Sequence, residues 1–446
     1  PTRGSSTLGG GMPVEIAETN LRACFLKTGR KADCCGCEAC ASVCPVNAVA
    51  MCEDEEGFRY PVIDKDVCIG CGRCEVACSL PVGRFHAANA QRGFGGSIKD
   101  VNLLADSTSG GAFTAIATAF LENDGIVFGV ESSGVYKARH ASVSSAEGLV
   151  AFRGSKYVQS EIGDAYLRVR DHLKTGNRVL FSGTPCQIDG LYGSLGRLAD
   201  SPLLLTVEVV CEGVPTPRLI EKQLSYVSDK WFKGQPIESM RYRDKWNSAC
   251  SSSNRWDLEG MSFAVAGWDH QATSNEGKTS KRRVIDRWFN PFWSIWLQHL
   301  VSRPSCAECP FARPERVADI TLGDLWGVHI YCPDLYNDDR GASLAVCNTE
   351  KGLAAFEAAM PLMESRELDM VDVVRYQGPM RKPTGANPRR EECMNDLRSM
   401  GWREFTRKWA KKPTLKLLVS KYLWGTNKQV CAKANIASRK CGKKDS

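Results

Sequence analysis

Two cysteine runs with the same spacing lie near the N-terminus of the chain. Each run has the pattern C-x2-C-x2-C-x3-C, and together they comprise Cys34, Cys37, Cys40, Cys44, Cys68, Cys71, Cys74 and Cys78. In proteins with this pattern, the fourth cysteine of each run binds the cluster of the other run. The spacing therefore predicts two [4Fe-4S] clusters, one held by Cys34, Cys37, Cys40 and Cys78, and one held by Cys68, Cys71, Cys74 and Cys44.

Structural zinc and disulfides are the alternatives for these cysteines. Zinc sites usually take two separate pairs of ligands, and disulfide frameworks are typical of short secreted chains. Gly36 and Gly70 lie inside the runs, where backbone amides have to approach inorganic sulfur. We therefore expect a bacterial-ferredoxin arrangement, a small pseudo-symmetric domain over residues 21–84 that moves electrons one at a time.

Length and composition limit the remaining possibilities. The chain has 446 residues, enough for two or three domains, and its apolar and charged fractions of 43% and 24% are those of a globular protein. No apolar run approaches the roughly 20 residues of a membrane span, and no signal peptide is expected. With 21 cysteines, we expect a reducing, cytoplasmic location. Residues 1–11 look like a cloning remnant ahead of a natural start at Met12, and residues 1–20 are set apart as a leader.

The positive charge is concentrated at the C-terminus. The net charge is +7, but residues 403–446 contain 13 Lys or Arg and two Asp or Glu, so this segment carries +11 and the rest −4. No basic face on a folded module is found, which excludes nucleic acid. Residues 401–446 are predicted to form a basic helix and tail. The helix either is solvated or makes weak contact with a membrane surface or an acidic partner, and Pro413 interrupts it.

Helical and strand-like patterns alternate after residue 85. We predict helices at 111–122, 161–175, 187–198, 218–228 and 350–360, and strands at 126–128, 178–182, 203–211, 318–322 and 342–347. This alternation favours an α/β fold with a mostly parallel sheet over residues 85–400. Residues 245–285 are polar and predicted to be an irregular insertion, either a lid or disordered.

Three loops of this region are candidate site loops, because ligands bind at the carboxyl ends of strands in such sheets. Two of them, 107–111 and 183–187, are rich in small residues and precede helices. They either bind a phosphate or are simple helix N-caps. In the third loop, 319–327, Asp324 and Trp326 either contact a planar cofactor or belong to a buried strand that ends in a turn.

Taken together, these segments resemble the beta subunit of coenzyme F-420 hydrogenases and dehydrogenases, a family of iron–sulfur flavoproteins. The resemblance extends from residue 34 to about residue 392. The matching segments are 109–111, 154–159, 183–187, 211–215, 303–311, 319–327 and 348–352.

The resemblance implies that the chain binds FAD. It places Ser109, Gly110, Gly111, Lys156, Gly183 and Thr184 around the flavin and its pyrophosphate, with Lys156 near a phosphate or the flavin N1 region. Family members often have His at the position of Glu212, so the substrate is in doubt more than the cofactor. The family's substrates include a deazaflavin and a chlorophyll derivative.

Four further cysteines form a second group of candidate ligands, namely Cys186, Cys211, Cys306 and Cys309. They either bind a third [4Fe-4S] cluster, or bind a zinc ion, or are ordinary buried thiols. Cys186, at a predicted helix start, is alternatively a reactive thiol.

We therefore predict an iron–sulfur flavoprotein oxidoreductase that couples single-electron transfer to two-electron, FAD-mediated chemistry on a small molecule or deazaflavin. Its electron partner would be a ferredoxin or a partner redox subunit, and a homo-oligomer is left open. The alternative is an electron-transfer subunit with no substrate of its own. A third hypothesis, a binding protein without redox turnover, conflicts with the eight clustered cysteines.

Overall fold

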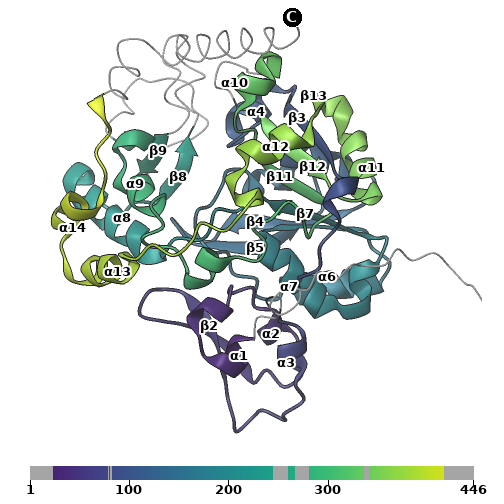
Figure 1. The fold of residues 1–446 in the computed structure, drawn as a ribbon, viewed down its shortest axis with the longest axis horizontal. Helices are drawn as coiled ribbons and strands as arrows, with labels where there is room; N and C mark the ends of the chain where they lie inside the picture. The colour runs from purple at the N-terminus through teal and green to yellow at the C-terminus, as the bar shows by residue number, and fades with distance from the viewer. Residues whose placement is uncertain are drawn as a thin grey trace, which may run out of the picture.

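The computed structural model describes residues 24–78, 80, 83–244, 260–266, 281–335 and 341–415. The predicted leader and most of the predicted basic tail lie outside the described residues. None of the helices in these ranges is long and apolar enough to cross a membrane. The described residues form a small N-terminal unit, a large sheet covered by helices and a small sheet with its own helices (Figure 1).

The N-terminal unit repeats one backbone conformation at its two cysteine runs. Gly36 and Gly70 have φ of 70° and 68°, and Glu38 and Gly72, one residue before a short helix in each run, have φ of 62° and 69°. The predicted pseudo-symmetry is therefore visible in the backbone. The elements of the unit are α1 (Phe25–Thr28), α2 (Ala39–Ser42), α3 (Arg73–Val76) and the antiparallel pair β1 (Val49–Glu53) and β2 (Arg59–Ile63).

Eight strands form the large sheet, in the order β13-β3-β12-β11-β7-β6-β4-β5. The block β11, β7, β6 and β4 is parallel, and the flanking strands pair antiparallel. The predicted α/β class is confirmed. The strands are β3 (Arg92–Ile98), β4 (Ile126–Ser132), β5 (Ala138–Val143), β6 (Val179–Gly183), β7 (Leu204–Val209), β11 (Ile320–Asp324), β12 (Ser343–Cys347) and β13 (Met363–Leu368).

Helices cover both faces of this sheet because side chains alternate along each strand. Val127 and Leu180 pack with α5 and α11 on one face, whereas Phe128 and Phe181 pack with α6 and α7 on the other. The helices of this part are α4 (Val101–Asp106), α5 (Ala112–Leu121), α6 (Ala165–Lys174), α7 (Pro185–Leu195), α10 (Val328–Tyr331), α11 (Glu350–Ala359) and α12 (Met370–Tyr376).

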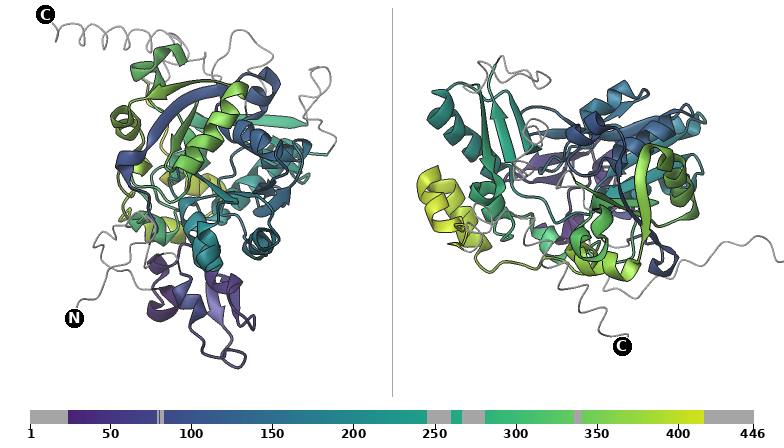
Figure 2. Two further views of the ribbon diagram at one scale, coloured as in Figure 1. Left: turned by 90° about the vertical axis from the view of Figure 1, so that its right-hand side faces the viewer. Right: turned by 90° about the horizontal axis from the view of Figure 1, so that it is seen from above.

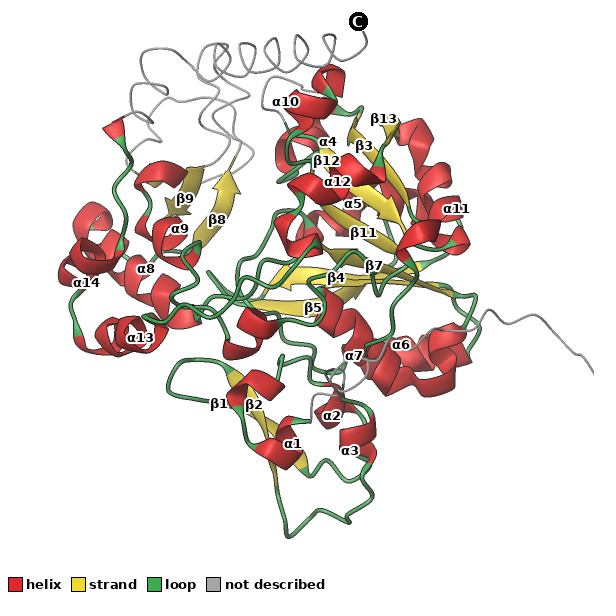
Figure 3. Cartoon of the chain, viewed as in Figure 1, coloured by secondary structure: helices red, strands yellow, loops and turns green. Residues whose placement is uncertain are grey.

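The small sheet lies beside the large one and has the order β10-β9-β8 (Figure 1, Figure 3). The prediction of an irregular insertion over 245–285 is wrong in its described part, because β9 and most of β10 fall within it. All five residues of β9 are buried, which the polar composition of the segment concealed. The elements are β8 (Ser239–Asp244), β9 (Gly260–Ala264), β10 (Arg282–Asp286), α8 (Pro217–Phe232), α9 (Pro291–Trp296), α13 (Arg390–Ser399) and α14 (Trp402–Trp409).

The C-terminal helix α14 belongs to the core of this small-sheet region. Trp402, Phe405 and Trp409 are buried against residues of α8 and α13. The domain boundary predicted at residue 400 therefore crosses one hydrophobic core. Over Trp402–Trp409, protein packing therefore occupies the apolar face that we expected to be solvated or to contact a membrane surface or an acidic partner.

The N-terminal unit lies against α7, on the face of the large sheet that α6 and α7 cover (Figure 1, Figure 2). Its helix α2 contacts α7 and α6, and Ala39, Ala77 and Leu80 join the core that covers this face. The cysteine-rich unit is therefore packed on the α/β body, and one of its cysteine runs lies close to that body.

Candidate functional site

A cavity of about 410 Å³ opens at the carboxyl ends of β6, β7 and β11. Residues of the large sheet line one side, and Arg243, Trp293 and Trp296 of the small-sheet region line the other. This is the position at which α/β sheets bind ligands. Most of the residues predicted to contact a flavin line it, namely Ser109, Gly111, Lys156, Gly183, Thr184, Asp324 and Trp326.

Two helices begin at the wall of this cavity. Gly111, with φ of 80°, is the N-cap of α5, and Thr184 is the N-cap of α7. The Thr184 backbone N–H donates to Oε1 of Gln187 at 3.0 Å, which completes a capping box. The positive ends of both helix dipoles therefore point toward the same cavity, where they would stabilise an anionic group.

Gly110 is the predicted flavin contact that does not line the cavity. A Cβ at this position would lie 2.4 Å from the carbonyl oxygen of Gly96 and 2.4 Å from the backbone nitrogen of Ser343. Glycine is needed here because the loop passes close to β3 and β12. The structure thus assigns Gly110 to packing.

Lys156 lines the cavity, but backbone groups surround its ammonium. Nζ donates to the carbonyl oxygens of Val130 at 2.8 Å, Arg153 at 3.1 Å, Phe152 at 3.2 Å and Ala151 at 3.3 Å. An ammonium has three donors, so these four acceptors already occupy it. Burial lowers the pKa of Lys156 to about 8. Its position organises the loop, and a direct phosphate contact remains only a prediction.

Aromatic rings and unpaired polar atoms form part of the cavity wall. The Tyr157 ring meets the rings of Trp293 and Trp296 edge to face, with centroids 4.7 and 5.2 Å apart. Four buried atoms have no hydrogen-bond partner in the described part of the chain: Nε1 of Trp293, Nε1 of Trp296, Nε of Arg153 and Oε1 of Gln377. Buried polar atoms are almost always paired. These atoms are therefore unusual, and the four residues that carry them all line the cavity.

Charges of both signs complete the wall. Arg243 Nη1 donates to Oδ2 of Asp324 at 2.6 Å, so this predicted cofactor contact is already engaged with the small sheet. Glu212 also lines the cavity. Burial raises the pKa of its carboxyl, and the charge of Arg287 opposes that shift. The guanidinium of Arg287 lies 6.0 Å from the exposed ring of Trp326.

The second group of predicted thiols gathers beside the cavity. Cys186 lies in the first turn of α7 and Cys211 follows β7, and both line the cavity. Cys306 lies in a short 3-10 helix, and Cys309 follows it. A Cβ on Gly213 would lie 3.1 Å from Cβ of Cys306, and the Gly213 N–H donates to Cys211 Sγ at 3.4 Å.

The pKa values of these thiols indicate how close they are. Burial, followed by the neighbouring charge of Cys306, raises the pKa of Cys211 to about 12, and the same two causes raise the pKa of Cys309 to about 11. Thiolates become stable in such surroundings when a cation is bound. In type, these donors match the ligands of zinc and iron–sulfur sites.

The thiols predicted to hold the first cluster share one small cavity in the N-terminal unit, which is lined by Cys34, Cys37, Cys40 and Cys78. Cys78 of the second run therefore lies at one cavity with three cysteines of the first run. Burial, and then the charges of Cys37 and Cys34, raise the pKa of Cys40.

Two further cysteines at this cavity were missed by the sequence reasoning. Cys24 and Cys35 also line it. A hydrogen bond from Cys78 lowers the pKa of Cys24 to about 6. Both lie outside the spacing of the motif, although the adjacency of Cys35 to Cys34 was a signal in the sequence.

The predicted second set is more open. Cys68 and Cys71 are exposed, and Cys44 and Cys74 are partly buried. In the ranges that the structure describes, no three His, Cys, Asp or Glu side chains are grouped closely enough to hold a single metal ion. The ligand sets of all three clusters thus remain predictions.

One face of α7 connects the first run to the cavity. Cys186, Gly190 and Gly193 follow one another at helical intervals, so they lie on the same face. A Cβ on Gly190 would lie 2.9 Å from Cβ of Cys37, and a Cβ on Gly193 would lie 2.3 Å from the carbonyl oxygen of Ala77. The two glycines let the cysteine loops pack directly on the helix that begins at the cavity.

Polar contacts follow the same route. The thiol of Cys35 makes a hydrogen bond with the sulfur of Cys186. Gln159, which lines the cavity, donates from Nε2 to the carbonyl oxygens of Cys35 at 2.8 Å and Gly36 at 2.9 Å. The loop of the first cysteine run therefore contacts both the second thiol group and the cavity wall.

Two family models match the chain. Residues 176–372 match the model for the C terminus of the beta subunit of coenzyme F420 hydrogenase/dehydrogenase, and residues 33–82 match the 4Fe-4S dicluster domain. The resemblance inferred from the sequence is confirmed. The second match contains all eight cysteines of the two runs, so the N-terminal unit is an iron–sulfur domain.

Individual relatives match only parts of the chain. The chain is 28% identical to the F subunit of the F420H2 dehydrogenase of Methanosarcina mazei over 166 residues, which are 34% of this chain and 46% of that protein. It is 46% identical to an uncharacterized ferredoxin of Methanocaldococcus jannaschii over 44 residues, 10% of this chain and 24% of that protein. These matches span less than half of either relative.

Among solved structures, the chain aligns with one from the F420-reducing [NiFe] hydrogenase complex of Methanosarcina barkeri. The TM-score is 0.40 at 16% identity, over 64% of this chain and 87% of that chain.

Proposed function

We propose that the chain passes electrons between its iron–sulfur clusters and an FAD bound in the 410 Å³ cavity. The proposal is supported by the match of residues 176–372 to the C terminus of the coenzyme F420 hydrogenase/dehydrogenase beta subunit and of residues 33–82 to the 4Fe-4S dicluster domain. One observation carries this proposal. The thiols form a continuous route from the first cysteine run, through Cys35 and Cys186, to the cavity wall.

The cavity supports FAD in three respects. The starts of α5 and α7 supply backbone N–H groups for a pyrophosphate. The aromatic wall suits a planar ring system, and the side chains of Trp293, Trp296 and Gln377 line the same cavity. When bound, FAD exchanges electrons singly or in pairs and so links one-electron carriers to hydride chemistry.

A third [4Fe-4S] cluster on Cys186, Cys211, Cys306 and Cys309 is part of the proposal. These thiols come from three segments that lie far apart in sequence. Cys186 and Cys211 line the cavity, and Cys306 lies close to Gly213 beside Cys211. Zinc and unligated thiols are the alternatives. A cluster is favoured because this position lies on the electron route.

The proposed substrate is a deazaflavin or another small hydride donor or acceptor. Two electrons and one proton make up the hydride that such a molecule gains or loses, and the clusters would supply or take the electrons one at a time. Glu212, Arg287 and Trp326 line the outer wall, so we expect them to contact the substrate and determine its identity.

Anaerobic purification with assays for iron, sulfide and flavin tests the proposal. We expect about twelve irons and one FAD per chain with three clusters, and about eight irons with only the two predicted by the motif. Cys306→Ser should lower the iron content by about four per chain, whereas Cys393→Ser, in the core of the small-sheet region, should leave it unchanged. A chain that retains iron but no flavin would contradict the FAD site.

The alternative function is electron transfer without a substrate of its own. It is favoured by the relatives, one of which is named as a subunit of F420H2 dehydrogenase. The purified chain, reduced anaerobically with a viologen, distinguishes the two. Reduction of a deazaflavin by the chain alone supports an oxidoreductase, and reduction only after a partner subunit is added supports the alternative.

A further inference from the structure

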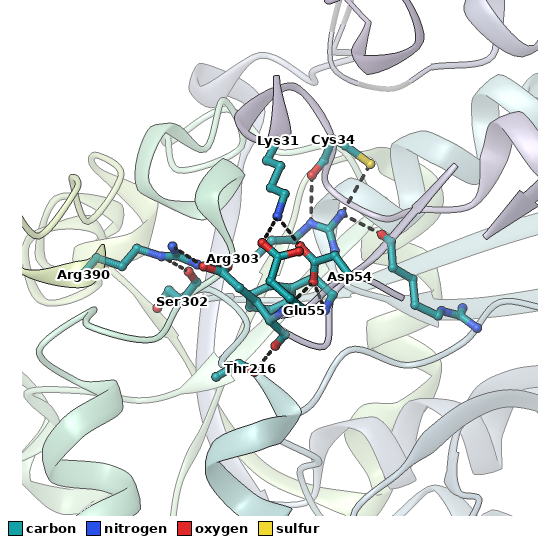
Figure 4. A network of polar contacts seen from close by, with 11 residues as sticks. Lys31, Cys34, Asp54, Glu55, Thr216, Ser302, Arg303 and Arg390 are labelled. Atoms are coloured by element: carbon teal, nitrogen blue, oxygen red, sulfur yellow. Dashed lines mark hydrogen bonds and ion pairs between the residues drawn. The ribbon is translucent and has the colours of Figure 1, made fainter. Parts of the chain in front are cut away.

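Arg303 is a buried guanidinium at the junction between the N-terminal unit and the α/β body (Figure 4). The geometry points to Arg303 as the residue that raises the reduction potential of the first cluster, the one predicted on Cys34, Cys37, Cys40 and Cys78. This inference rests on the dicluster domain and is independent of the FAD site and of the third cluster.

Arg303 contacts a predicted ligand of the first cluster directly. Nη2 donates to Cys34 Sγ at 3.3 Å, and Nε donates to the carbonyl oxygen of the same residue at 2.8 Å. Nη2 also donates to the carbonyl oxygen of Arg59 at 2.9 Å, and Nη1 donates to Oε1 of Gln159 at 3.1 Å. Four contacts fix the planar group, so the N–H to sulfur contact is part of a rigid arrangement.

The surroundings keep this group away from solvent. Arg303 is 1% exposed, and its guanidinium lies 4.4 Å from the ring centroid of Tyr60 and 5.5 Å from that of Phe58. Both rings belong to the N-terminal unit. Water therefore screens the positive charge only weakly, and its field acts strongly on nearby sulfur.

The missing counter-ion is the observation that singles out Arg303. Two other arginines are buried among the residues that the structure describes, and both pair with carboxylates, Arg316 with Glu208 and Arg282 with Asp244. In the part of the chain that the structure describes, Arg303 forms no ion pair with a carboxylate. An isolated buried charge is costly, so a negatively charged group at Cys34 is the natural counter-ion. A [4Fe-4S] cluster with four thiolates carries that negative charge.

The expected consequence concerns the potential. Reduction adds one electron to the cluster and makes it more negative, so a nearby cation and an N–H to sulfur hydrogen bond stabilise the reduced state more than the oxidised state. Net charge and hydrogen bonds to sulfur are known determinants of cluster potential. Arg303 therefore makes the first cluster, which lies next to the α/β body, easier to reduce, and this favours electron flow toward the body.

The alternative is that Arg303 merely docks the N-terminal unit on the body. Arg390 provides a matched control, because it also bridges the two parts. Its Nε donates to the carbonyl oxygen of Ser302 at 2.8 Å, and its Nη1 and Nη2 bind the carboxylate of Glu56 at 3.1 and 2.5 Å. None of these contacts involves a cysteine of the first cluster.

The test is a redox titration of the anaerobically purified protein, followed by EPR, for Arg303→Gln, Arg303→Lys and Arg390→Gln. The component of the first cluster is identified by its change in Cys34→Ser. In Arg303→Gln, the ratio of reduced to oxidised first cluster at a fixed potential should fall about tenfold, a shift of about 59 mV for one electron. Arg303→Lys should shift it less, in the same direction, and Arg390→Gln should leave it unchanged.

Two results would overturn the inference. One is an unchanged potential in both Arg303 variants with iron content intact. The other is an equal shift in Arg390→Gln, which would assign the effect to docking. If Arg303→Gln fails to retain its clusters, Arg303→Lys decides the question alone, because it keeps the charge and loses the bidentate geometry. The other clusters of the same sample serve as internal controls, since their potentials should not move.

Discussion

The two cysteine runs of the N-terminal unit share a backbone conformation and differ in their surroundings. Cys34 and Cys37 of the first run are 9% and 7% exposed, whereas their equivalents Cys68 and Cys71 are exposed. The motif alone does not distinguish the runs, because the spacing and the left-handed glycines are the same. The difference arises from the rest of the chain, which covers one run and leaves the other open.

Packing explains which run is covered. The first run packs through Cys37 on Gly190 of α7, and its Cys34 accepts a hydrogen bond from Arg303. In the second run, the side chains of Ile69 and Val76 are 64% and 88% exposed. Burial and hydrogen bonding both tune a cluster's potential. One duplicated motif thus supplies an inner position next to the cavity and an outer position that a redox partner can approach.

Removing one equivalent cysteine from each run should break the symmetry most clearly. Cys37→Ser and Cys71→Ser should each cost the iron of one cluster, about four per chain. Cys37 also packs in the core next to Gly190, so its variant should lower the free energy of unfolding by a further 1–3 kcal/mol or so. Iron assays and thermal unfolding check this. Equal melting temperatures for the two variants would contradict the inner and outer assignment.

A bulky residue on the shared face of α7 should separate the N-terminal unit from the body. In Gly193→Val the new Cβ would meet the Ala77 carbonyl oxygen, 2.3 Å away in the present structure, and overpacking of this kind costs about 1–3 kcal/mol. We expect a lower melting temperature and faster proteolysis after the N-terminal unit. Gly378→Val is the control, because no atom lies within 4 Å of its Cβ position. Similar losses in both variants would argue against tight docking.

Much of the fold follows from local sequence patterns. The strand predicted at 178–182 is Val179–Gly183 in the structure, and the helix predicted at 350–360 is Glu350–Ala359. Both have clear apolar periodicity and end at recognisable breakers. Strand β9 was missed because its five buried residues lie in a polar stretch. Its burial depends on α8 and α9, which local periodicity does not report.

Some features of the candidate site also follow from local sequence, whereas others depend on long-range contacts. The loop positions at Gly111 and Thr184 follow from small residues before helices, and both line the cavity. The contact between Arg303 and Cys34 joins residues 269 positions apart, and no spacing rule connects them. Cys35 has no ligand spacing either, and only the packing of α7 brings it to Cys186. Long-range contacts of this kind require the folded structure.

Cys35 offers a test of whether the inner run communicates with the cavity. Cys35→Ala should leave the iron content unchanged, because Cys35 is outside the predicted ligand sets. It should slow electron transfer from the inner cluster to the proposed flavin about fivefold to tenfold, or about 1 kcal/mol. Stopped-flow reduction of the flavin measures this. Cys52→Ala, at an exposed thiol of the same unit, should leave the rate unchanged. A loss of iron in Cys35→Ala would instead make Cys35 a ligand.

The smallest effect should come from a charge at the rim of the inner run. Lys31 Nζ lies 2.7 Å from Oδ2 of Asp54 and 2.8 Å from Oε1 of Glu55, and it lies 5.7 Å from the centroid of the Tyr60 ring, which Arg303 also contacts. Because partly exposed ion pairs are screened by water, Lys31→Met should cost only about 0.2–1 kcal/mol of unfolding free energy, and less at high salt. Thermal unfolding at two salt concentrations checks this.

The same variant sharpens the comparison between a rim charge and a buried one. Lys31 already has two carboxylate partners, so its removal changes the net field at the inner cluster little, whereas Arg303 has the Cys34 sulfur as its partner. The potential of the inner cluster should therefore stay constant in Lys31→Met while it falls in Arg303→Gln. Equal shifts in the two variants would mean that overall charge, and not the contact with the ligating sulfur, determines the potential of the inner cluster.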